Sequence, residues 1–129
     1  MPQAYKIAAQ ILTEGLIDLG VLKGSVKENM QAIAYRPFFM HGLGHWLGLD
    51  VHDVGDYKLD GEPRPLAAGM VLTIEPGLYI PADTDCDPEL RGVGVRIEDD
   101  ILVTENGHIN LTQGVPVQID EIEALMAQG

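Results

Sequence analysis

Three of the four histidines lie within twelve positions, in a segment that is rich in glycine. His41, His45 and His52 belong to the run HGLGHWLGLDVHD, which covers residues 41–53. Imidazole binds divalent first-row metals through one ring nitrogen and also transfers protons near neutral pH. Glycine allows a backbone to approach a ligand closely and to adopt unusual dihedral angles. The segment is therefore a candidate for metal binding or acid–base chemistry, and hydrogen-bonded structural histidines are the alternative.

Two glutamates differ from the other acidic residues because apolar residues precede them. Glu75 follows the run VLTI, and Glu98 follows GVGVRI. A carboxylate embedded in an apolar strand loses hydration unless a cation compensates it. Strand alternation predicts that Gly94, Arg96 and Glu98 share one face. Arg96 is therefore a candidate partner for a carboxylate or for a substrate carbonyl, and a plain salt bridge between Arg96 and Glu98 is the alternative.

Histidines combined with Glu75 and Glu98 form a mixed nitrogen and oxygen ligand set. Such a set suits manganese, iron, cobalt or zinc, and its oxygen-rich balance favours manganese. Two metal ions that share carboxylates generate a nucleophile at neutral pH. Two dications carry four positive charges whereas two glutamates supply two negative ones, so further anionic ligands are needed. The chain before the first of the three clustered histidines offers only carboxylates on predicted helices, namely Glu14, Asp18 and Glu28. The sequence therefore predicts an incomplete metal site.

The hydropathy pattern predicts helices at the two ends of the chain and strands between them. Apolar residues spaced three and four apart predict a helix over 8–19, and shorter helices are predicted over 26–34 and 119–127. Short apolar runs bounded by turn residues predict strands over 71–80, 92–97 and 101–104, with a hairpin turn at 105–107. Two or three helices with antiparallel strands define an α+β fold.

Composition limits the possible function classes. The chain has 129 residues, of which 8 are basic and 20 acidic, so its formal net charge is −12. One domain over 1–129 fits this length. The acidic balance argues against nucleic acid as a partner. No apolar stretch approaches the roughly 20 residues that span a bilayer, no signal peptide is visible, and Cys86 is the single cysteine. We expect a soluble cytoplasmic protein without a membrane partner. The acidic segment 83–89 lacks the glycine and terminal glutamate of a calcium loop, so we expect a solvated turn there.

Three motifs resemble the catalytic domain of the aminopeptidase P (Xaa-Pro aminopeptidase) group, in the pita-bread metallopeptidase family. They are HGLGHWLGLDVHD at 41–53, TIEPGLY at 73–79 and GVRIED at 94–99, and they occur in the same order as in that family. The resemblance covers nearly the whole chain and is densest over 39–104. It implies the C-terminal half of a pita-bread fold, with a curved and mainly antiparallel sheet.

The resemblance also implies a role for each matching residue. His45, Glu75 and Glu98 match metal ligands, Glu75 with an additional role in proton transfer and Glu98 as the bridge between two ions. Four further residues match family residues that line the substrate site or lie beside the metal centre: His41, His52, Tyr79 and Arg96. The resemblance implies catalytic roles for His41, His52 and Arg96. The implied cofactors are two divalent metal ions, most consistent with Mn²⁺. The implied partners are peptides with proline in second position.

The sequence departs from the family in one respect. The family's dinuclear site also uses two aspartates upstream of the first histidine, and nothing before His41 matches them. The non-catalytic N-terminal domain and the first half of the catalytic domain are also missing. We therefore expect weak metal binding and little or no activity from this chain alone. The uncovered apolar surface predicts self-association as a homo-oligomer.

Three functions fit these observations. The first is a manganese-dependent metalloaminopeptidase that hydrolyses the bond between an N-terminal residue and a following proline. The second is a prolidase-type Xaa-Pro dipeptidase. The third is a non-catalytic pita-bread binding module, against which the ordered set of His45, Glu75 and Glu98 argues.

Overall fold

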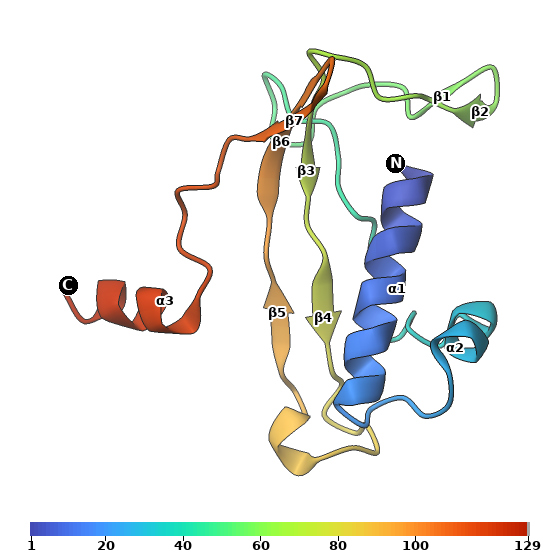
Figure 1. Ribbon diagram of the computed structural model, residues 1–129, viewed down its shortest axis with the longest axis vertical. Coiled ribbons are helices and arrows are strands. Elements are labelled where there is room, and N and C mark those ends of the chain that lie inside the picture. Colours follow the sequence, from blue (N-terminus) through green and yellow to red (C-terminus); the bar gives the residue numbers. More distant parts are fainter. Residues whose placement is uncertain (129) are drawn as a thin grey trace.

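The computed structural model describes residues 1–128 as helices packed beside an antiparallel strand ribbon, as the α+β prediction requires (Figure 1). The helices are α1 (Pro2–Asp18), α2 (Val26–Ala32) and α3 (Ile119–Met126), with one 3₁₀ turn, η1 (Pro88–Leu90). The strands are β1 (Lys58–Leu59), β2 (Glu62–Pro63), β3 (Val71–Ile74), β4 (Gly77–Tyr79), β5 (Gly94–Arg96), β6 (Asp99–Thr104) and β7 (Gly107–Asn110).

The helices follow from local sequence signals. α1 begins at Pro2, where the missing proline N–H has no cost, and it buries Ala9, Thr13 and Leu16 along one stripe. The predicted helix over 8–19 is therefore present, but it starts earlier and its buried stripe is centred differently. α2 begins at the predicted residue, with Ser25 and Glu28 forming a capping box. It ends two residues earlier than predicted.

The strands form one long antiparallel ribbon that is broken at its middle. β3 pairs with β6, and β6 pairs with β7, while β4 pairs with β5. In Figure 1, β4 continues the course of β3 and β6 continues that of β5. The single strand predicted over 71–80 is therefore wrong at Glu75 and Pro76, which separate β3 from β4. Pro76 has no N–H to donate to a ladder, which is a physical reason for the break.

The histidine segment lies along the outer edge of β3. The Thr73 N–H donates to the His45 carbonyl over 2.9 Å, and the Glu75 N–H donates to the Leu43 carbonyl over 2.7 Å. A single bridge between Trp46 and Leu72 continues the pairing. Residues 43–47 thus behave as a short antiparallel edge segment that the sequence did not predict.

Gly44 makes this close approach possible. A Cβ atom on Gly44 would lie 1.8 Å from the Thr73 carbonyl oxygen, which no neighbouring backbone can accommodate. The glycine therefore allows the histidine segment to reach β3.

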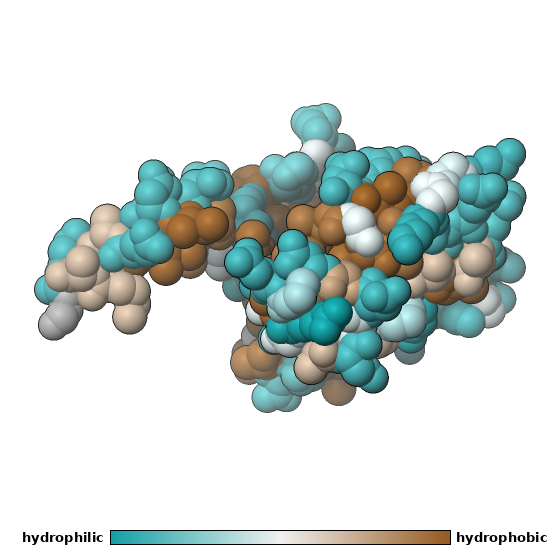
Figure 2. Space-filling view, turned by 90° about the horizontal axis from the view of Figure 1, so that it is seen from below, coloured by the Kyte–Doolittle hydropathy of each residue, from teal (hydrophilic) through white to brown (hydrophobic). Residues whose placement is uncertain are grey.

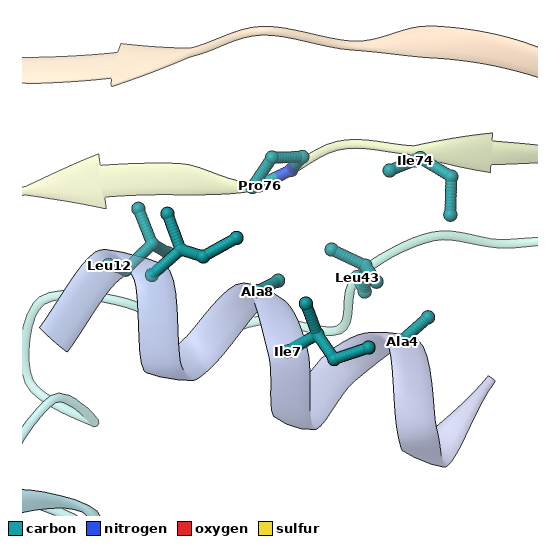
Figure 3. A pocket seen from close by; sticks show the side chains of 8 residues that line it. Ala4, Ile7, Ala8, Leu12, Leu43, Ile74 and Pro76 are labelled. Atoms are coloured by element: carbon teal, nitrogen blue, oxygen red, sulfur yellow. The ribbon is translucent and has the colours of Figure 1, made fainter. Parts of the chain in front are cut away.

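The core lies between α1 and the strand ribbon. Its fully buried members include Leu16 of α1 and Phe39, which stacks on Tyr5 with ring centroids 5.2 Å apart. An apolar groove of about 370 Å³ runs beside this core. Figure 3 shows Ala4, Ile7, Ala8 and Leu12 of α1 facing Leu43, Ile74 and Pro76 across it.

Two regions project from this body. β1 and β2 form a small hairpin around Asp60 and Gly61, both with positive φ. The Asp-Gly pair is a strong hairpin signal, although this hairpin is not among the predicted elements. α3 buries no residue and stands away from the strands, as the arm of the molecule in Figure 2 also shows. No helix within residues 1–128 has the length and apolar character needed to cross a membrane.

Candidate metal centre

The break in the strand ribbon brings three potential metal ligands together. His45, Glu75 and Glu98 each offer one donor atom, and these atoms all lie within 4.8 Å of one another. Within residues 1–128 this is the one such group of three or more. His45 comes from the edge segment, Glu75 from the gap between β3 and β4, and Glu98 from the gap between β5 and β6.

The pairing register explains why the two glutamates meet. Ile74 pairs with Asp99 on one side of the break, and Gly77 pairs with Arg96 on the other. The same register continues across the break, so Glu75 stands opposite Glu98. Neither glutamate lies within a regular strand, which corrects the expectation that both are embedded in apolar strands. Like charges directly opposite one another are destabilising in a ladder, and a bound cation removes that cost.

Arg96 is the one basic side chain that contacts both carboxylates among the described residues. Its Nη1 lies 3.8 Å from Glu75 Oε2, and its Nε lies 3.8 Å from Glu98 Oε2. The predicted contact between Arg96 and Glu98 is present, but it is shared with Glu75 and neither distance is that of a hydrogen bond. One guanidinium therefore faces two carboxylates, and the arrangement still favours an added positive charge.

The ring of His45 is oriented as a metal ligand requires. Its Nδ1 lies 3.0 Å from the Trp46 carbonyl oxygen. A carbonyl only accepts, so Nδ1 carries the hydrogen, and Nε2 is the ring nitrogen that is left to bind a metal ion. Nε2 points to Glu75 Oε1 at 3.4 Å. Metal-binding histidines characteristically donate their second ring nitrogen to such a carbonyl, so the donor set fits a divalent metal ion.

The remaining predicted site residues lie in two places around this cluster. The ring of His52 is exposed and meets the ring of His45 edge-on, with centroids 4.3 Å apart. His41 and Tyr79 contact each other with centroids 5.6 Å apart. A Cβ atom on Gly77 would lie 2.6 Å from Tyr79 Oη and 2.9 Å from His41 Nε2. His41 Nε2 is buried without a hydrogen-bond partner.

One residue of the site was missed by the sequence analysis. Thr73 is buried. Its hydroxyl oxygen lies 3.0 Å from the backbone nitrogen of His45 and 3.0 Å from Glu75 Oε1. Its position two residues before Glu75 in a strand places it on the same face, and that spacing was the available signal.

The acidic segment 83–89 forms a turn, as predicted. Asp87 caps the short turn η1 by accepting from the Glu89 N–H over 3.0 Å. The carboxylates of this segment form no ligand group within residues 1–128.

The chain belongs to metallopeptidase family M24, whose sequence profile matches residues 2–105. Among its relatives is the Xaa-Pro aminopeptidase of Escherichia coli (strain K12), which is 58% identical over 117 residues. That match covers 91% of this chain but only 26% of the relative. The chain therefore spans about a quarter of the length of the relatives that it matches.

Solved structures give the same result for the fold. Proline aminopeptidase P II from Yersinia pestis matches with a TM-score of 0.87 and 54% identity, over 96% of this chain and 28% of that one. Escherichia coli aminopeptidase P with the inhibitor Pro-Leu matches with a TM-score of 0.84 and 57% identity, over 93% of this chain and 27% of that one. The resemblance to aminopeptidase P and its pita-bread fold is confirmed.

Proposed function

We propose that this chain is the C-terminal part of the catalytic domain of an Xaa-Pro aminopeptidase. The reaction is hydrolysis of the bond between an N-terminal residue and a following proline. The observation that carries the proposal is the opposed pair Glu75 and Glu98, with a donor atom of His45 within 4.8 Å. Identity of 58% to the Escherichia coli enzyme over most of the chain supports the substrate class.

Divalent metal ions are the cofactors that this ligand set implies. His45, Glu75 and Glu98 would hold them. Bound ions of this kind polarise a carbonyl oxygen and activate water at neutral pH. The predominance of oxygen ligands favours manganese. Three ligands with two negative charges are too few for two dications, so we propose that the chain alone binds metal weakly and has little or no activity.

The other residues act on the substrate. Glu75 takes a proton from the attacking water and gives it to the leaving amine. The Thr73 hydroxyl at Oε1 and the Arg96 guanidinium near Oε2 hold its carboxylate in place for this role. His52 stabilises negative charge that develops on the scissile carbonyl oxygen, since its exposed ring stands beside His45. Arg96 positions the substrate beside the two carboxylates.

The paired side chains of His41 and Tyr79 line the substrate site. The free Nε2 of His41 supports this role, because a buried ring nitrogen without a partner is available to a ligand.

Two further proposals concern the cytoplasmic location and the self-association of the protein. A single, partly buried free cysteine is compatible with a reducing cytoplasm. Exposed apolar side chains on α1 and α3, such as Ile7, Ile11 and Met126, support self-association as a homo-oligomer.

A chimera tests the proposed function. The corresponding segment of Escherichia coli Xaa-Pro aminopeptidase is replaced by this chain. The Escherichia coli protein then supplies the rest of the catalytic domain. We expect metal-dependent release of the first residue from peptides with proline in second position. Glu98→Ala in the chimera removes that activity, whereas Glu89→Ala, on the distant acidic turn, leaves it unchanged.

Two results would contradict the proposal. A folded chimera that retains full activity with Glu98→Ala would show that the ligand assignment is wrong. Cleavage of Xaa-Pro dipeptides without cleavage of longer Xaa-Pro peptides would identify a prolidase-type dipeptidase instead. Circular dichroism melting of each variant confirms that the compared proteins are folded.

A further inference from the structure

Thr73 connects two of the proposed metal ligands that come from different segments of the chain. Its side chain is 1% exposed, and it lies on β3 beside the histidine segment. We propose that Thr73 is a positioning residue for the metal centre, whose hydroxyl orients the Glu75 carboxylate and ties it to the backbone of His45. This inference rests on the proposed function, since it concerns the same site.

The hydrogen-bonding capacity of the hydroxyl allows only one arrangement. The His45 N–H donates to Thr73 Oγ1 over 3.0 Å. Thr73 Oγ1 also lies 3.0 Å from Glu75 Oε1, and a carboxylate only accepts, so the one hydroxyl proton points to Glu75. Both contacts are therefore made at once, with the threonine as acceptor from one ligand residue and donor to the other.

This arrangement fixes the two oxygens of Glu75 separately. Oε1 is held by Thr73, and Oε2 faces the guanidinium of Arg96 at 3.8 Å. The side chain of Glu75 is 14% exposed, and a hydrogen bond in such a shielded place is stronger than one in water. Oε1 is also the oxygen that lies 3.4 Å from His45 Nε2. Thr73 therefore sets the distance between these two atoms, both of which are proposed to bind the metal.

A purely structural role is the competing explanation. Thr73 lies in the strand that pairs with residues 43–47, and its own N–H bonds to the His45 carbonyl over 2.9 Å. That backbone bond persists in any substitution except proline. The hydroxyl can therefore be removed while the pairing that holds the segment stays in place.

The test compares Thr73→Val, which keeps the volume and β-branching but loses the hydroxyl, with Thr73→Ser, which keeps the hydroxyl but loses a methyl group. Each ¹⁵N-labelled chain is titrated with Mn²⁺, and paramagnetic broadening of amide signals near His45, Glu75 and Glu98 reports the affinity. We expect Thr73→Val to weaken binding by about 10- to 100-fold, the usual effect of losing such a supporting contact. We expect Thr73→Ser to bind Mn²⁺ with an affinity close to that of the wild type.

A second readout needs no metal. The amide of His45 loses its side-chain acceptor in Thr73→Val and exchanges with solvent faster, while Thr73→Ser keeps the protection. Unchanged Mn²⁺ affinity or unchanged His45 protection in folded Thr73→Val would overturn the proposal, and so would equal losses of affinity in Thr73→Val and Thr73→Ser. If Thr73→Val does not fold, Thr73→Ala takes its place against Thr73→Ser.

The two proposals fail in different ways. If wild-type chain shows no broadening at the three ligands, the proposed metal function fails. The orienting role of Thr73 then stands or falls on the exchange of the His45 amide. If wild-type chain binds Mn²⁺ and Thr73→Val binds equally well, only the role of Thr73 is wrong.

Discussion

The two gaps in the strand ribbon hold the same residue type in opposite surroundings. Glu75, between β3 and β4, is 14% exposed, and its side chain contacts Thr73, His45 and Arg96. Glu98, between β5 and β6, is 39% exposed and makes one contact, with Arg96 at 3.8 Å. The two carboxylates face each other in one register, so position in the ladder does not cause the difference.

The cause is the histidine segment. Residues 43–47 cover the outer edge of β3 and supply Glu75 with a backbone acceptor and a ring nitrogen. The His45 N–H also donates to the Thr73 hydroxyl, which in turn donates to Glu75. No described element covers the other gap in this way: residues 91–98 are all exposed. The packed side of the site is therefore built by this chain, and we expect further anionic ligands to approach from the side of Glu98.

The largest effect is expected where the histidine segment meets β3. Gly44→Ala would place a methyl group 1.8 Å from the Thr73 carbonyl oxygen, and backbone must move to relieve the clash. We predict a loss of about 3 kcal/mol in the free energy of unfolding, at the upper end of overpacking costs. Urea denaturation measures it.

The matched control for this prediction is Gly42→Ala. A Cβ atom on Gly42 meets nothing within 4 Å, so this variant is expected to change stability by less than about 1 kcal/mol. Equal effects of the two alanines would show that residues 43–47 do not lie against β3 as described.

The next prediction concerns the stability of the metal-free chain. Glu75→Ala leaves the buried Thr73 hydroxyl without an acceptor and costs about 1–3 kcal/mol. Glu98→Ala removes an exposed carboxylate with one long contact and changes stability by less than about 0.5 kcal/mol. Thermal melting in the presence of a chelator compares the two variants. A larger loss at Glu98 than at Glu75 would reverse the assignment of packed and open sides.

A smaller effect is expected at the aromatic pair that supports the packed side. Tyr57 stacks on Trp46 with ring centroids 5.3 Å apart, and its hydroxyl accepts from the backbone N–H of Trp46 over 3.1 Å. Tyr57→Phe keeps the stacking and loses the hydrogen bond, for an expected cost of about 1 kcal/mol. Urea denaturation that shows no change would mean that the Trp46 amide finds another partner.

The smallest effect is expected at α2, away from both gaps. Hydrogen bonds from the Ser25 side chain and then from the Ser25 backbone N–H lower the pKa of Glu28 below its ordinary value of 4.5. A lowered pKa in the folded state means that the contribution to stability is present above the unfolded pKa and is lost as pH falls through the folded pKa.

The check is the melting temperature of wild type and Glu28→Gln against pH. We expect wild type to be more stable at neutral pH and the difference to shrink in acid, below about pH 4.5. A difference that grows as pH falls would contradict the capping geometry.

The residues proposed as metal ligands could be identified from the sequence, but the strand pairing that brings them together could not. The run around His45 and the two glutamates after apolar strands were visible as residue types, and the α+β class followed from periodicity. The break at Pro76 was not predicted, because the apolar residues on both sides of Glu75 and Pro76 indicate a continuous strand more strongly than one proline indicates a gap. The pairing of residues 43–47 with β3 depends on contacts 28 residues apart in sequence, which local patterns do not encode.

Titration of the ¹⁵N-labelled chain with Mn²⁺ most directly tests the claim that His45, Glu75 and Glu98 bind a metal ion together. Paramagnetic broadening detects even weak binding, and the acidic turn at 83–89 serves as an internal comparison. We predict that broadening appears first around His45, Glu75 and Glu98 and disappears there in folded Glu98→Ala. Broadening that begins at the acidic turn, or that persists unchanged at His45 in Glu98→Ala, would contradict it.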